Sequence, residues 1–172
     1  GVTHPLDAIN LDDVCVIGVT GSMATGKSHL CTATAQAGKV MHFSVDHRMH
    51  VGLKFDKGLI TNAIRVFSPG VAIEGWKSAW SDASVSRESL LDIGSSALDK
   101  SEIRRMYLND TDKRKAWDRV CGDYLITKLY EAKLALAISR VIRAHQAGTK
   151  EDGKLVLLVE SANCDLFGLM AD

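Results

Sequence analysis

The stretch that decides the fold is Val14–Ser28, with the sequence VCVIGVTGSMATGKS. Its first half is an apolar run typical of a buried strand, and residues 21–28 form a complete phosphate-binding loop of the pattern GxxxxGK(S/T). Gly21 and Gly26 permit a tight turn and a close approach of the backbone to a phosphate. Because residues 27–37 are rich in helix formers, the chain passes from strand to loop to helix, as a phosphate site requires. This pattern predicts that the chain binds a nucleoside triphosphate.

The loop and the start of the helix supply the expected nucleotide contacts. Successive backbone N–H groups wrap the phosphates, and the helix adds its partial positive end. Lys27 is expected to reach the β- and γ-phosphates, and the Ser28 hydroxyl to coordinate Mg²⁺. The expected cofactors are therefore ATP and Mg²⁺. The predicted nucleotide-binding residues are Gly21, Ser22, Met23, Ala24, Thr25, Gly26, Lys27, Ser28 and His29.

Three apolar runs predict a parallel sheet. Residues 14–20 and 40–45 flank the expected helix, which ends at Gly38. Two strands joined by one helix predict a parallel pair. The third run, residues 154–160, is continuous enough to be buried on both faces. Ligands of such sheets lie beyond the carboxyl ends of the strands, where the phosphate loop also falls.

Residues 47–153 show no convincing strand pattern and are predicted to be a mainly helical insertion. Capping patterns indicate helix starts at Asp99 and near Thr111. Apolar residues recur at helical spacing over residues 117–147, and Gly148 is expected to end that helix. An insertion of this kind favours a small-molecule kinase over a motor protein or a GTPase.

The predicted fold class is therefore α/β: a three-layer phosphate-loop NTPase core with a parallel sheet and a helical, substrate-binding insertion. The core is assigned to residues 1–46 and 154–172, and the substrate-binding insertion to residues 47–153. Such cores usually have about five strands. We therefore expect a further C-terminal part of the core to follow Asp172.

Several polar side chains are the remaining candidates for catalysis, metal contact or substrate binding. Asp46 and Lys27 are the predicted catalytic residues, because a carboxylate beside the γ-phosphate accepts a proton from an attacking hydroxyl or helps to hold Mg²⁺. The alternative for Asp46 is a solvated loop aspartate. Glu160 ends the third strand, where an acid often contacts Mg²⁺ through water, but a simple strand-end charge is the preferred interpretation. His50 and Arg87 are candidates for an anionic substrate, with surface roles as the alternative.

The composition of the chain argues against nucleic acid and membranes as binding partners. The 21 lysines and arginines balance the 21 aspartates and glutamates, so no global field favours nucleic acid or an acidic membrane. No apolar run approaches the roughly 20 residues that span a bilayer, and residues 1–13 lack the pattern of a secretory signal. Neither the four cysteines nor the histidines at 42, 47 and 50 show spacing typical of a metal site. We expect a cytoplasmic protein that binds neither nucleic acid nor membranes.

With these residues in place, the chain resembles the dephospho-coenzyme A kinase family from Val16 to Asp172. The sequence IGVTGSMATGKS is similar to that family's opening, including Thr20 just before the loop. Asp46 and His50 match an Asp-x-Asp pair followed by Arg or His, with Ser44 in place of the first aspartate.

The resemblance implies an activity and a set of substrate contacts. Mg-ATP would phosphorylate the ribose 3′-hydroxyl of dephospho-coenzyme A, which the helical insertion would hold. The implied substrate-binding residues are Thr20, Asp46, His50 and Arg87. The alternatives are another phosphate-loop kinase acting on a nucleoside or nucleotide, and a non-catalytic, degenerate nucleotide-binding module. Oligomeric state does not follow from the sequence.

The chain departs from the family pattern at two places. The family's His-Pro in the long-helix region is replaced around Gly122-Asp123. Its Pro-Leu-Leu-Phe-Glu after the third strand is replaced by residues 160–164, ESANC. These changes bear on recognition of the coenzyme A precursor more than on ATP binding.

Overall fold

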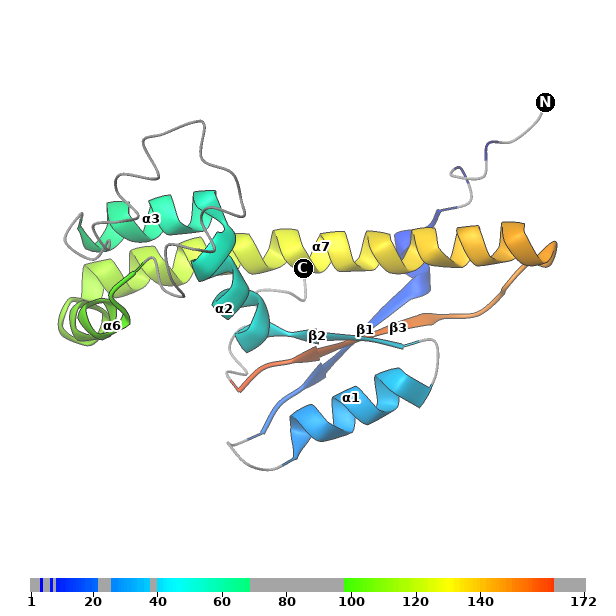
Figure 1. Ribbon diagram of the computed structural model, residues 1–172, viewed down its shortest axis with the longest axis horizontal. Coiled ribbons are helices and arrows are strands. Elements are labelled where there is room, and N and C mark those ends of the chain that lie inside the picture. Colours follow the sequence, from blue (N-terminus) through cyan, green and yellow to red (C-terminus); the bar gives the residue numbers. More distant parts are fainter. Residues whose placement is uncertain are drawn as a thin grey trace. The chain divides into compact units, whose positions relative to one another are not determined.

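The protein is an α/β chain with a small open parallel sheet and mostly helices, as seen in a computed structural model (Figure 1). The structure describes His4, Asp7 and residues 9–21, 26–37, 40–68 and 98–162. The chain divides into two compact units, one formed by residues 1–46 and 125–172 and the other by residues 47–124.

The first unit contains the sheet, which follows the short 3₁₀ turn η2 (Leu11–Asp13). Its parallel strands are β1 (Val14–Val19), β2 (Val40–Ser44) and β3 (Leu155–Glu160). The order β1-β3-β2 corrects the expectation that the first two strands pair directly. The physical reason lies in β3, whose Leu157 and Val159 are fully buried. The most apolar strand is buried best with a neighbour on each edge.

The strand register places three residues in a row at the carboxyl edge of the sheet. Val19 of β1 and Ser44 of β2 both lie opposite Glu160 of β3. The amide of Ser161 then donates to the Val19 carbonyl over 3.0 Å, which extends the pairing by one residue. The last side chain of β3 is therefore held in the centre of this edge.

Helices lie on both sides of the sheet, while most of β1 stays exposed, with Val16 at 37% and Ile17 at 44%. In Figure 1, α1 (Lys27–Ala37) lies on one side, and the later part of α7 (Thr111–Ala147) runs along the other. Leu125, Leu129 and Leu136 recur at helical spacing on α7 and are buried. Residues 125–147 of this continuous 37-residue helix belong to the unit with the sheet, whereas our division by sequence placed them in the insertion.

The second unit is helical, as predicted for its described residues. It contains most of α2 (Val45–Phe55), then α3 (Lys57–Phe67), α6 (Lys100–Asn109) and the first part of α7. The predicted helix start at Asp99 is confirmed, since its carboxylate accepts from the amides of Ser101 and Glu102.

A compact apolar core holds the second unit together. Phe67 of α3 and Trp117 of α7 both belong to it, with their ring centroids 5.5 Å apart. Leu59, Ile60 and Ala63 of α3 complete the buried face of that helix. The spacing of these residues on α3 is the i, i+3, i+4 pattern of an amphipathic helix.

We predict that Gly52→Ala destabilises the second unit. A Cβ at this position on α2 would lie 2.5 Å from the Tyr124 hydroxyl oxygen and 2.9 Å from Leu59 Cδ2. Overpacking of this kind costs about 1–3 kcal/mol, which urea denaturation followed by circular dichroism measures.

Gly58→Ala is the matched control on α3. The nearest atom to its Cβ is Asp56 Oδ1 at 3.4 Å, an ordinary contact. Alanine is favoured over glycine in a helix, so stability should stay unchanged or rise by up to about 1 kcal/mol. Equal losses in the two variants would contradict the close packing of Gly52.

Candidate functional site

Gly26, the last residue of the loop motif before its lysine, leads directly into α1. Gly26 has a φ of 81°, a left-handed conformation that favours glycine. Its carbonyl accepts the first helical hydrogen bond, from Leu30 N–H over 3.0 Å. Lys27, Ser28 and His29 form the first turn of α1, which contains no acidic residue. The positive end of the helix is therefore reinforced by a lysine, which suits an anionic ligand.

Glu160 lies where α1 meets the sheet. The Ser28 hydroxyl donates to Glu160 Oε1, and His42 of β2 interacts with Glu160 Oε2 over 2.7 Å. An ionised carboxylate only accepts hydrogen bonds, so the pairing requires a proton on His42 Nε2. The Glu160 side chain is only 7% exposed. Two donors thus satisfy a buried carboxylate at the end of the central strand.

Sequence reasoning missed the importance of this carboxylate. Glu160 was interpreted mainly as a strand-end charge, and His42 as one of three clustered histidines without ligand geometry. The available signal was an acid at the end of the most apolar run in the chain. No spacing rule connects it to Ser28 or His42, because these residues come from α1 and β2.

A cysteine adjoins the same carboxylate. Cys31 of α1 is 1% exposed. Burial raises the pKa of its thiol, and the negative charge of Glu160 raises it further. The ligand atoms of Cys31, His42 and Glu160 all lie within 4.8 Å of one another.

Of the predicted site residues before Gly26, the structure describes only Thr20 and Gly21. Thr20 and Gly21 directly follow β1 at the carboxyl edge of the sheet, and Thr20 is exposed. Ser22, Met23, Ala24 and Thr25 lie outside the described residues, so their predicted contacts stay predictions.

Asp46 lies two residues beyond the strand position that pairs with Glu160. It is an exposed residue in the first turn of α2, rather than in a loop after a strand. This helix begins at Val45, directly after β2. A carboxylate in the first turn also interacts favourably with the positive end of its own helix. Asp46 therefore has a structural explanation beside the catalytic one.

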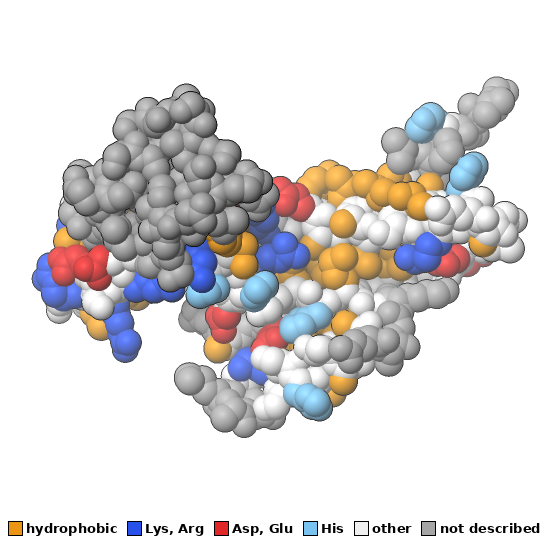
Figure 2. All heavy atoms as spheres, in the orientation of Figure 1, with side chains coloured by type: hydrophobic (Ala, Val, Ile, Leu, Met, Phe, Trp, Pro, Cys, Tyr) orange, Lys and Arg blue, Asp and Glu red, His pale blue; other side chains and the backbone are white. Residues whose placement is uncertain are grey.

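The second unit has a cluster of basic side chains. His50 on α2 is exposed, and its pKa is lowered by the positive charge of Lys54, by some burial, and by Lys100 and His47. Figure 2 shows further Lys and Arg side chains around α6, with Asp and Glu side chains among them, and Arg105 pairs with Glu102. Lys54 and Lys100 therefore give the surface around His50 a positive potential, which suits an anionic group. Arg87, the other predicted substrate contact, lies outside the described residues.

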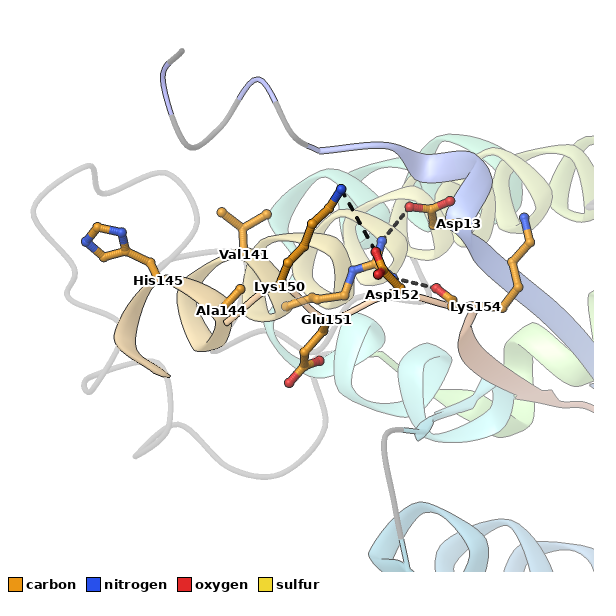
Figure 3. A pocket seen from close by; sticks show the side chains of 10 residues that line it. Asp13, Val141, Ala144, His145, Lys150, Glu151, Asp152 and Lys154 are labelled. Atoms are coloured by element: carbon orange, nitrogen blue, oxygen red, sulfur yellow. Dashed lines mark hydrogen bonds and ion pairs between the residues drawn. The ribbon is translucent and has the colours of Figure 1, made fainter. Parts of the chain in front are cut away.

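A hollow of about 600 Å³ lies at the opposite edge of the sheet (Figure 3). Asp13 and Lys154, which line it, directly precede β1 and β3. Arg140 of α7 pairs with Asp13 and donates to the Gly153 carbonyl over 2.6 Å. These contacts join α7 to the amino ends of the strands. Because parallel sheets bind ligands at the carboxyl edge, we assign this hollow a structural role.

Comparisons with protein-family models, curated proteins and solved structures found no match for this chain. Of the helices in the described part of the chain, none combines the length and the apolar character that crossing a membrane requires.

We predict that the cysteines react at different rates, in an order that tests the burial of Cys31 in the site. In the folded protein, exposed Cys15 should react with iodoacetamide at pH 8 before Cys31, whose burial and raised pKa both limit the thiolate. Cys121 should also react slowly, because burial and the charge of Asp118 raise its pKa to about 12. That shift leaves about a thousandfold less thiolate than an ordinary cysteine.

Peptide mass spectrometry over a time course measures this order. The unfolded chain in urea is the control, where all three should react at similar rates. Modification of Cys31 as fast as Cys15 in the folded protein would contradict the burial of Cys31.

Proposed function

We propose that this protein is a phosphate-loop kinase that transfers the γ-phosphoryl group of ATP to a hydroxyl of a small anionic acceptor. The observation that carries the proposal is the contact between Ser28, the last residue of the loop motif, and the buried Glu160 at the end of β3. A hydroxyl at the start of the loop helix and an acid on the neighbouring strand are the pair that positions Mg²⁺ in phosphate-loop enzymes.

The donor chemistry of this pair fits the metal. Mg²⁺ prefers oxygen ligands and usually keeps several waters. Ser28 would coordinate it directly, and Glu160 would hold it through its hydration shell. When bound, Mg-ATP supplies the transferred phosphoryl group and neutralises much of its charge.

Lys27 and the start of α1 would provide the electrostatic part of the reaction. The partial positive charge at the start of α1 arises from backbone N–H groups without helical partners. The helix has no acidic residue of its own in that turn, and the neighbouring Glu160 carboxylate is engaged by Ser28 and His42. Fixed dipoles and a lysine at the same place stabilise charge that develops during phosphoryl transfer.

The acceptor we propose is dephospho-coenzyme A, which the family resemblance implies. The positive charges of Lys54 and Lys100 beside His50 in the helical unit support an acceptor that carries phosphate groups. Asp46 would orient the attacking hydroxyl and accept its proton.

We predict that Lys27→Ala abolishes acceptor-dependent ADP release. Loss of a positive charge at the phosphates should lower turnover by at least about 10²–10³-fold. The measurement compares ADP release from Mg-ATP with and without dephospho-coenzyme A. Lys150→Ala, at a side chain that is 86% exposed in the unit with the sheet, is the matched control and should keep full activity.

Each outcome distinguishes the alternatives. Near-normal turnover in Lys27→Ala would exclude the loop assignment. Stimulation by a nucleoside instead of dephospho-coenzyme A would identify a different kinase. ATP binding without turnover on any acceptor would support the non-catalytic module.

We predict that Asp46→Asn lowers kcat by about 10²–10⁴-fold, the range for loss of a general base. ATP affinity should change little, because the amide keeps the size and helix position of the carboxylate. Steady-state kinetics and equilibrium binding of a fluorescent ATP analogue measure the two effects. Equal losses in both would show that Asp46 acts only as a structural or metal-contacting residue.

A further inference from the structure

We propose that Cys31, His42 and Glu160 form a binding site for a zinc-like divalent metal ion. They contribute a thiol from α1, an imidazole from β2 and a carboxylate from β3. These three groups are the side chains that ligate Zn²⁺ in proteins. Their convergence from three elements goes beyond the phosphate-loop function.

The distances are close to those of a bound ion. All ligand atoms lie within 4.8 Å of one another, whereas a tetrahedral zinc ion places its ligands about 3.3–3.8 Å apart, given bonds of about 2.0–2.3 Å. His42 Nε2 and Glu160 Oε2, at 2.7 Å, are closer than this because they lie at hydrogen-bond distance. A metal ion that replaces this hydrogen bond would separate these two atoms slightly.

Burial gives the site a protected interior and an accessible side. Cys31 is almost fully buried, and the side chain of Glu160 is 7% exposed. The His42 side chain retains 19% exposure. Three protein ligands also leave the fourth zinc position for water or another ligand.

The ligand set selects the type of metal. Thiolate and imidazole prefer Zn²⁺ and similar ions, whereas Mg²⁺ binds oxygen ligands. Glu160 would belong to both sites, since it also accepts from the Ser28 hydroxyl. A zinc ion bound to this carboxylate should therefore weaken Mg-ATP binding, a consequence that rests on the proposed function.

Cobalt titration of the complete chain tests the metal site without any nucleotide. After treatment with a chelator, the protein should bind one equivalent of Co²⁺ and show a thiolate-to-cobalt charge-transfer band, which Zn²⁺ then removes. Cys31→Ala should abolish the band, and His42→Ala should weaken Co²⁺ binding by about tenfold or more. Cys15→Ala removes an exposed thiol on β1 and should leave the band intact.

Absence of the band in the wild-type protein, or its survival in Cys31→Ala, would overturn the proposal. Circular dichroism checks the fold of each variant. X-ray absorption of the zinc-loaded wild-type protein provides a test without mutations, because the proposal requires one sulfur ligand and otherwise nitrogen or oxygen ligands. A coordination shell without sulfur would also overturn it. If the metal binds but Mg-ATP affinity does not fall, the shared role of Glu160 in the proposed function is wrong, and the metal site stands.

Discussion

The buried carboxylate of Glu160 is the constraint on which the arrangement of the sheet unit depends. A charge in the interior is tolerated only where donors surround it. Ser28 from α1 and His42 from β2 supply those donors. This requirement links the start of the loop helix, an outer strand and the central strand at one point. The carboxyl edge of the sheet is therefore held together by polar contacts, whereas its interior is held by apolar packing.

The same carboxylate explains why one location could serve two kinds of chemistry. Toward Ser28 it offers oxygen ligands, which suit Mg²⁺ beside a triphosphate. Toward Cys31 and His42 it belongs to a sulfur, nitrogen and oxygen set, which suits Zn²⁺. Both proposals draw on a single residue, so occupation of one site should alter the other. Such sharing would connect the nucleotide site to the availability of a second metal.

The long helix α7 contributes residues to both compact units. Its later residues cover the sheet, while Trp117 near its start packs in the core of the helical unit. One continuous helix therefore supplies apolar side chains to both cores. This is why a division of the chain at Lys154, based on where the strand pattern resumes, differs from the division seen in the structure.

Local patterns in the sequence determined the glycine turn at Gly26, the helix that follows it, the apolar strands and the helix start at Asp99. Each depends on residues within a few positions of one another, where capping, periodicity and glycine conformations act. Tertiary structure alone decided the strand order and the partners of Glu160, which lie 132 and 118 residues away in the chain. No spacing rule reaches across such distances. The pairing arises because the most apolar strand takes the central position and brings its terminal acid between α1 and β2.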